Sequence, residues 1–227
     1  MDCVEGIEMI ECAVFIRQDK VLVISDIHIG FEQSLNRQGV LVPRTSFDNT
    51  LKRIMTLIER TKPEKIVFNG DIKDDFATIG EQEWRNVKRL IDNIKPKAEI
   101  VFIKGNHDTM LEPIATARLI KIVKEYKTGN VTIMHGDVLP DKWQKTLILG
   151  HYHPAIRIRE KAKSETYKCF LLSEYKNSRI LLQPAFNNLS QGGDIRNHLP
   201  EFINPEKTNV YVVDKKILPF GRLKGLN

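Results

Sequence analysis

The chain has 227 residues, of which 41% are hydrophobic and 28% are charged, and its formal net charge is +6. These proportions are ordinary for a globular protein, and no repeat, low-complexity segment or Gly/Ser/Pro-rich linker interrupts the chain, so we predict one domain over residues 1–227. The acidic start MDCVEGIEMIECAVFIRQDK is unlike a signal peptide, and no apolar run approaches the about 18 residues of a membrane span, so we expect a cytoplasmic protein.

Strand and helix patterns alternate in the first half of the chain. The apolar runs VLVIS (21–25), KIVFN (65–69) and EIVFI (99–103) predict buried strands. Between them, the segments from Arg44 to Thr61 and from residue 80 to residue 94 have apolar side chains at helical spacing, and the second stops before Pro96. Such alternation predicts a sheet that is covered by helices.

Short β-type runs fill the second half of the chain. Residues 116–136 predict two strands around a turn at Thr128-Gly129-Asn130, and the runs TLILG, AIRIRE, TYKCFLLSE, SRILLQPAF, NVYVVD and KILPFG follow. The sequence YKNS at 175–178 predicts a hairpin turn, and helical patterns are weak beyond residue 120. We therefore predict an α/β protein in which a helix-rich half and a strand-rich half pack two sheets together.

Charge is distributed unevenly along the chain. Residues 1–110 contain 16 Lys/Arg and 18 Asp/Glu, a net charge of −2, whereas residues 111–227 contain 19 and 11, a net charge of +8. The densest basic stretch, IRIREKAKSETYK, contains Arg157, Arg159, Lys161, Lys163 and Lys168. It indicates either an anionic partner such as nucleic acid or a solvated face whose basic side chains protect sheet edges.

The sequence around the three cysteines indicates neither metal binding nor catalysis. Cys3, Cys12 and Cys169 form no CxxC pair, and none has a His or a carboxylate beside it in a recognisable metal-binding spacing. We expect three reduced thiols that take no part in catalysis or metal binding.

Five of the apolar runs end in residues that can bind a metal or transfer a proton. They are Asp26-Ile27-His28 after VLVIS, Gly70-Asp71 after KIVFN, Gly105-Asn106-His107-Asp108 after EIVFIK, His135-Gly136-Asp137 after VTIM, and Gly150-His151-Tyr152-His153 after TLIL. Because ligands bind at the carboxyl ends of strands in α/β sheets, we expect all five motifs to meet at one rim. The sixth histidine, His198, lies outside these motifs, and we expect it to have a structural or surface role.

Imidazole and carboxylate ligands without thiolate suit Mn, Fe, Zn or Ni rather than a structural zinc site. Asp26 and His28 are spaced i, i+2, as are His151 and His153, and in an extended chain this spacing directs both side chains of a pair to the same side. The candidate ligands are too many for one tetrahedral ion, but two ions about 3.5–4 Å apart and bridged by a carboxylate would use them all. Two-metal centres of this kind serve in-line displacement at phosphorus.

The ordered series D-x-H, GD, GNHD, HGD and GHxH, from Asp26 to His153, resembles that of the calcineurin-like metallophosphoesterases. The resemblance implies a four-layer α/β/β/α sandwich of two mixed sheets. Within this superfamily, the small size and the later segment PAFNNLSQGGDIRN look like the ICC-like, SbcD-related phosphoesterases of archaea.

The same resemblance implies the ligands of two divalent metal ions. Asp26, His28 and His153 would bind one ion, Asn106, His135 and His151 would bind the other, and Asp71 would bridge the two. We expect Mn²⁺, with Ni²⁺, Fe²⁺ or Zn²⁺ as alternatives.

The resemblance also implies roles for His107 and Asp108 in catalysis. A metal-bound hydroxide would attack phosphorus, and His107 would stabilise the charge and protonate the leaving oxygen as a general acid. Asp108 would orient the His107 imidazole, although the family usually has the longer Glu at this position. For Lys73 and Asp74, in the segment IKDDF, no role can be assigned from the sequence.

The substrate is open at this stage. A site of this type hydrolyses phosphodiesters or phosphomonoesters, and no segment resembles the DNA-binding cap of the large SbcD-type nucleases, which favours small or flexible phosphodiesters. A nuclease that acts on nucleic-acid ends and a non-catalytic scaffold of the same fold are the alternatives, but a scaffold should lack a ligand or His107, and neither is missing. We expect no membrane partner, and the oligomeric state is open. Within the loop 187–198, Arg196 either contacts phosphate or belongs to an ordinary surface loop.

Overall fold

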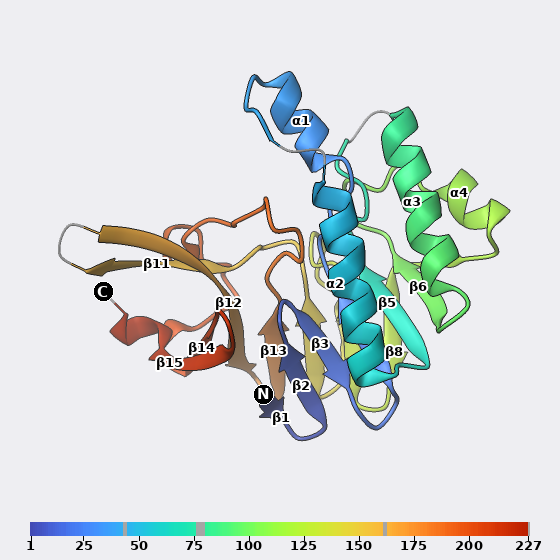
Figure 1. Cartoon of the computed structure of the whole chain (residues 1–227). Helices are drawn as coiled ribbons and strands as arrows, with labels where there is room; N and C mark the ends of the chain where they lie inside the picture. The colour runs from blue at the N-terminus through green and yellow to red at the C-terminus, as the bar shows by residue number, and fades with distance from the viewer. Residues whose placement is uncertain (43–44, 76–79, 161–162, 227) are drawn as a thin grey trace.

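The computed structural model describes residues 1–42, 45–75, 80–160 and 163–226. In this part of the chain, two mixed sheets pack face to face (Figure 1). The first sheet contains, in spatial order, β1 (Asp2–Val4), β2 (Ile7–Ile10), β3 (Ala13–Ile16), β4 (Val21–Ile24), β5 (Lys65–Asn69), β6 (Glu99–Ile103) and β7 (Lys121–Val123). Strands β1 to β4 are antiparallel to one another, whereas β4 to β7 are parallel.

The second sheet is built from the later part of the chain. Its spatial order is β15 (Ile217–Arg222), β14 (Thr208–Val213), β12 (Lys163–Tyr175), β13 (Ser178–Leu182), β10 (Thr146–Leu149), β9 (Val131–Met134) and β8 (Glu125–Thr128). Strand β11 (Ala155–Glu160) pairs with the first half of β12 in an antiparallel hairpin. Figure 1 shows this hairpin extending beyond the body of the sandwich.

Apolar side chains on both faces of the central strands explain their continuous hydrophobic sequence. On β4, β5 and β6, Val23, Val67 and Val101 face the second sheet and contact Ile148 and Phe170 there. The alternate residues on these strands pack under helices in a second buried cluster. Because strand side chains alternate between the two faces of the sheet, these strands contribute to two separate hydrophobic cores.

Within the described ranges, four α-helices lie outside the first sheet or near its edge. They are α1 (Phe31–Arg37), α2 (Ser46–Thr61), α3 (Glu81–Ile94) and α4 (Glu112–Ala117). The buried stripes of α2 and α3, including Ile54, Leu57, Val87 and Leu90, pack on the outer face of the sheet. Helix α1 stands apart from the other three at the top of Figure 1.

Loops and short 3₁₀ helices cover the outer face of the second sheet. They include η1 (Ile195–Asn197), η2 (Pro205–Lys207) and η3 (Leu223–Gly225). Buried Ile195, Ile203 and Leu223 from these segments pack against Leu171 and Leu182 of the sheet. The α/β class with two mixed sheets is therefore confirmed, and its outermost layer on this side consists of 3₁₀ turns rather than α-helices.

Most of the predicted elements are present within about two residues of their expected ends. The predicted helix from Arg44 begins at Ser46 in the structure, and Arg44 itself lies outside the described residues. The YKNS turn joins β12 to β13, with Tyr175 paired to Ser178. Helices α1 and α4 were not predicted, because segments of seven and six residues are too short to show a helical period.

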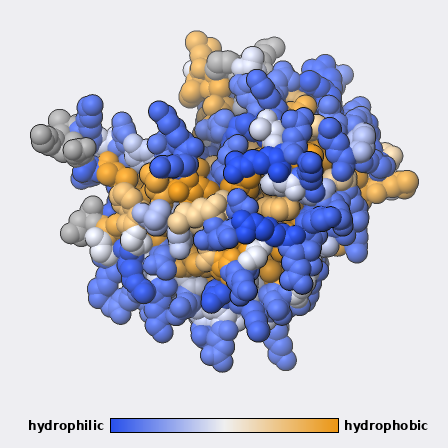
Figure 2. Space-filling model, turned by 60° about the horizontal axis from the view of Figure 1, so that its bottom comes forward, coloured by the Kyte–Doolittle hydropathy of each residue, from blue (hydrophilic) through white to orange (hydrophobic). Residues whose placement is uncertain are grey.

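No helix within the described ranges is both long enough and apolar enough to cross a bilayer. Figure 2 turns the molecule so that the end opposite α1 comes forward, and apolar surface is visible there between hydrophilic side chains.

Candidate metal centre

The five predicted motifs follow the carboxyl ends of five strands from two sheets. Asp26 and His28 follow β4, Asp71 follows β5, Asn106 to Asp108 follow β6, His135 follows β9, and His151 and His153 follow β10. Within each sheet these strands are parallel neighbours, so their ends lie at the same edge. The face-to-face packing of the sheets brings the two edges together, as the sequence predicts.

One group of ligand-type atoms is formed by Asp26, His28 and His153. Nε2 of His28 lies 3.3 Å from Nε2 of His153, which in turn lies 3.3 Å from Oδ1 of Asp26. Asp26 is completely buried and His28 is nearly so.

A second group is formed by Asn106, His135 and His151. Oδ1 of Asn106 lies 3.0 Å from Nε2 of His135 and 3.1 Å from Nδ1 of His151. The two ring nitrogens are 3.3 Å apart. His135 is buried, whereas Asn106 and His151 are half-buried.

Asp71 lies between the two groups. Its Oδ1 is 3.4 Å from Nε2 of His135, and its Oδ2 is 3.8 Å from Nε2 of His28. The backbone N–H of His107 donates to Oδ1 at 3.0 Å and fixes the carboxylate. One oxygen therefore faces each group, which is the arrangement that a bridging carboxylate needs.

The spacing of these atoms fits a divalent cation. Two imidazole nitrogens bound tetrahedrally at about 2.0–2.1 Å from one ion would be about 3.3–3.4 Å apart. The His28–His153 and His135–His151 pairs both have this separation. Nitrogen and oxygen ligands without sulfur suit Mn, Fe, Zn or Ni. The donor atoms of the two groups thus have the spacing and the chemistry of divalent-cation ligands.

Left-handed backbone is concentrated at this rim. Among the described non-glycine residues, ten have positive φ, and five of them are Asp26 (56°), His28 (40°), Asp71 (49°), His151 (63°) and His153 (41°). Such residues persist only where the surroundings hold them, and they cluster at functional sites. The backbone at these pairs is therefore not extended: Asp26 and His28 belong to one group, whereas His151 and His153 belong to different groups.

Comparison with known proteins agrees with this geometry. The family model described as calcineurin-like phosphoesterase matches residues 19–190. The chain belongs to the calcineurin-like phosphoesterase family. No match was found among curated protein sequences.

Three solved structures are similar to the chain to different degrees. The nuclease MPE of Pseudomonas putida has a TM-score of 0.70 at 19% identity and covers 92% of each chain. The phosphoesterase Yfce of E. coli has a TM-score of 0.43 at 14% identity, over 86% of this chain and 87% of its own. Wild-type Vps29 of Entamoeba histolytica, complexed with Zn²⁺, has a TM-score of 0.40 at 14% identity, over 88% and 96%.

Burial and close neighbours shift several pKa values in this centre. Burial would raise the pKa of Asp71, but the hydrogen bond and charge of His135 hold this pKa below its ordinary value. Burial would lower the pKa of His135, yet the hydrogen bond with Asp71 and the charge of Asp26 raise it to about 9. Burial and the neighbouring His135 lower the pKa of His151. A metal ion must therefore compete with protons for these side chains.

The His107 imidazole contacts the backbone of Asp74, and this contact orients the ring. Nδ1 of His107 lies 2.5 Å from the carbonyl oxygen of Asp74. The Asp74 carboxylate also accepts a hydrogen bond from Ser34 and lies 3.5 Å from Nδ1 of His28. Sequence reasoning assigned no role to Asp74, because a backbone carbonyl contact leaves no signature in the residue type.

Asp108 is buried and accepts three backbone hydrogen bonds. Its Oδ1 accepts hydrogen bonds from the backbone N–H groups of Ile72 (2.9 Å) and Lys73 (3.3 Å), and its Oδ2 accepts one from Gly105 (2.9 Å). Burial raises the pKa of Asp108 to about 7, against these three donors. Asp108 therefore fixes the backbone after β5 and at the start of the GNHD motif, and its role in orienting His107 stays a prediction from the sequence.

Other residues singled out from the sequence lie away from the two groups. The Arg196 guanidinium donates to Asp194 and to the carbonyl oxygens of Arg157 and Leu226, so it fastens the loop rather than facing a substrate. His198 is exposed. The cysteines are free thiols and belong to none of the described metal-ligand groups.

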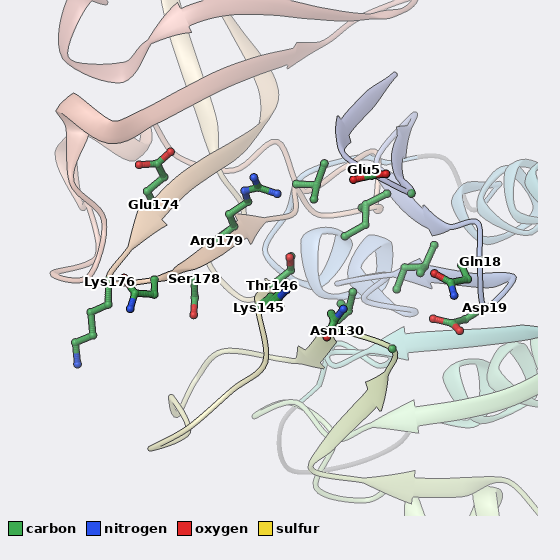
Figure 3. Close-up of a pocket in the computed structure, with 17 residues that line it drawn as sticks. Glu5, Gln18, Asp19, Asn130, Lys145, Thr146, Glu174, Lys176, Ser178 and Arg179 are labelled. Carbon is green, nitrogen blue, oxygen red and sulfur yellow. The ribbon is translucent and has the colours of Figure 1, made fainter.

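One cavity lies away from the metal-ligand groups. It has a volume of about 620 Å³ and lies at the opposite end of the sandwich, between the two sheets. Figure 3 shows Gln18 and Asp19 on one side of it and Lys145, Glu174 and Arg179 on the other. None of the residues of the metal-ligand groups lines this cavity.

Gly105 provides a test of how tightly the centre is built. A Cβ at residue 105 would lie 2.3 Å from both the backbone nitrogen and Oδ1 of Asp71. We expect Gly105→Ala to lower the free energy of unfolding by about 1–3 kcal/mol, the usual cost of overpacking. Denaturant unfolding measures this loss. Gly225→Ala is the control, since a Cβ there meets no heavy atom within 4 Å; equal effects of the two substitutions would contradict the close approach.

Proposed function

We propose that the protein is a dinuclear-metal-dependent phosphoesterase that hydrolyses phosphodiester bonds, with phosphomonoesters as further substrates. The proposed ligands are Asp26, His28 and His153 for one ion, Asn106, His135 and His151 for the other, and Asp71 for both. The observation that carries the proposal is Asp71, whose two oxygens face two groups of ligand atoms with metal-like spacing. Mn²⁺ is the proposed metal. The cytoplasmic location and the single domain stay predictions from the sequence.

When bound, two divalent ions would polarise the phosphoryl oxygens, make a water molecule more acidic and compensate developing negative charge. The chain's own contribution is to fix the ligands and a proton donor. All seven ligands expected of an active centre are present and converge, which supports an enzyme over a scaffold of the same fold.

His107 is the proposed general acid. If the Asp74 carbonyl at 2.5 Å accepts from Nδ1–H, the other nitrogen, Nε2, is the one that gains and loses a proton. Nε2 lies 3.8 Å from Oδ2 of Asp71, at the edge of the ligand groups. A proton on Nε2 is thus within reach of the rim where a leaving oxygen would depart. The carbonyl contact plays the orienting part that carboxylates play for other catalytic histidines.

Asp71→Asn tests the shared ligand. The amide keeps one oxygen but loses the charge and the second acceptor, so we expect metal content to fall from two ions per chain toward none, with loss of hydrolysis. Elemental analysis after dialysis against Mn²⁺, together with turnover of bis(p-nitrophenyl) phosphate, measures both. Asp48→Asn, at an exposed carboxylate, is the matched control. Two tightly retained ions in the Asp71 variant would contradict a bridging role.

His107→Ala tests the general acid. We expect both metals to remain and kcat/KM for a substrate with an alkoxide leaving group to fall by about 10²–10⁴-fold. A p-nitrophenolate group departs without a proton, so its hydrolysis should fall less. His198→Ala is the control, because His198 is the exposed histidine outside the motifs.

Two other outcomes would correct the role of His107. Equal losses on both substrates would indicate that His107 acts only through its charge. Lost metal would make it a ligand, since His28, Asp71 and His107 also form a group of ligand-type atoms.

A nucleic-acid substrate is the second candidate, and the β11–β12 hairpin favours it. Strand β11 begins two residues after His153. Cross-strand pairs place Arg157 with Thr166 and Arg159 with Ser164, so one face of the hairpin is basic and hydroxyl-bearing. Arg157 and Arg159 are exposed and make no described side-chain ion pair. The fold is shared with a nuclease, which is compatible with such a substrate.

Salt dependence of binding tests this candidate. If the hairpin neutralises Z phosphates, log K for a single strand should fall with log[salt] with a slope near −0.7Z. We expect replacement of Arg157, Arg159 and Lys163 by Ser to weaken binding and to reduce the slope; the fourth basic residue of this stretch, Lys161, lies outside the described residues. Replacement of Lys52, Arg85 and Lys97 by Ser removes the same charge from the helical side. Absence of binding at low salt would leave a small-diester enzyme.

A further inference from the structure

The loop that follows β13 contacts the backbone of the first motif. Asn187 is buried, and its side-chain Nδ2 donates to the carbonyl oxygens of Ile27 (3.1 Å) and His28 (3.2 Å). Its backbone N–H donates to the carbonyl oxygen of Asp26 at 3.3 Å. Three consecutive carbonyls of the Asp26–His28 segment therefore accept hydrogen bonds from one residue.

These hydrogen bonds hold a backbone that would otherwise relax. Asp26 and His28 have φ of 56° and 40°, a left-handed conformation that is uncommon for residues other than glycine. Residues keep this conformation only where several surrounding contacts hold it in place. Oδ1 of Asn187 accepts from the backbone N–H of Leu189 at 2.9 Å, so the amide is itself fixed in one orientation.

The same loop reaches a side chain of this group. Oγ of Ser190 lies 3.1 Å from Nδ1 of His153. For His153 to present an unprotonated Nε2 toward Asp26 and His28, its proton must be on Nδ1, and the Ser190 hydroxyl accepts it there. Such contacts fix the tautomer and ring orientation of a metal-binding histidine.

The loop also packs against the His153 backbone. A Cβ at Gly192 would lie 2.1 Å from the carbonyl oxygen of His153, and Gly192 has φ of 76°. Just beyond, Asp194 pairs with Ala155 in an isolated bridge. This approach is possible because residue 192 has no side chain.

The second group of ligands is held differently. Nδ1 of His135 lies 3.2 Å from the carbonyl oxygen of Asn69, at the end of β5. Among the described residues, no hydrogen bond joins residues 187–192 to Asn106, His135 or His151. The loop therefore contacts all three members of one group and leaves the other group alone.

We propose that residues 187–192 are a positioning loop that sets the affinity of one metal position, that of Asp26, His28 and His153, without acting on the other. This inference rests on the proposed function, because it needs two metal positions. It assigns the role of the PAFNNLSQGGDIRN segment, which the motifs do not explain.

Ser190→Ala is the sharpest test, because it removes one hydroxyl and leaves the backbone contacts in place. Loss of such a partner typically lowers metal affinity about 10–100-fold. We expect calorimetric titration with Mn²⁺ to show this loss at one of two sites, so that a single ion per chain remains at intermediate metal concentration. Ser190→Thr keeps the hydroxyl and should retain both sites.

Two further variants separate positioning from general stability. Asn187→Asp removes the two side-chain donors and should weaken the same site more than Ser190→Ala does. Asn93→Asp, at an exposed residue of α3 whose side chain donates to the carbonyl oxygen of Arg89, is the matched control and should leave both affinities unchanged. Unfolding of each metal-free variant, followed by circular dichroism, identifies a variant that has lost its fold.

The outcomes distinguish this inference from the proposed function. If the wild-type chain binds no Mn²⁺, the proposed function fails. If the wild-type chain binds two ions, and Ser190→Ala binds both as tightly or loses both equally, the proposed function stands and the positioning role of the loop is overturned.

Discussion

The constraint on which this site depends is the close contact of atoms that all carry lone pairs. Carboxylate, amide and imidazole atoms from both sheets lie 3.0–3.8 Å apart, several of them buried. Burying such groups without compensation costs free energy, since they lose water and repel one another. In the metal-free chain, protons provide part of the compensation, as the raised pKa of His135 indicates. A divalent cation compensates them better, so folding and metal binding are linked.

The fold holds these atoms in place through backbone contacts that continue beyond the strands. After β4 and β5 end, the N–H groups of Asp26, His28 and Ile29 donate to the carbonyls of Gly70, Asp71 and Ile72. The two loops therefore run side by side although their backbone is left-handed at four positions, Asp26, His28, Gly70 and Asp71. Asp108 accepts three more backbone N–H groups, those of Ile72, Lys73 and Gly105, which compensates the burial of its carboxylate.

The sequence predicts those parts of the centre in which the residue type itself indicates the chemistry. Asp26, His28 and His135 follow unmistakable apolar strands, and parallel strands have one carboxyl edge, so their convergence can be predicted. Asp74 and Asn187 could not be found in this way. Asp74 acts on His107 through its main chain, and Asn187 lies 160 residues from the carbonyl that it contacts. Likewise, short α1 is specified by its tertiary surroundings rather than by its own pattern.

The two metal-ligand groups draw on both sheets, so the packing between the sheets is part of the site. Asp71 comes from the first sheet, whereas His135 and His153 come from the second. Their separations are set by the buried layer between the sheets, where Val67 and Phe170 are completely buried. Protein interiors are packed as closely as organic crystals, so this layer fixes the sheet spacing with little freedom. A ligand geometry that tolerates about 0.5 Å of error therefore depends on apolar residues that touch neither metal nor substrate.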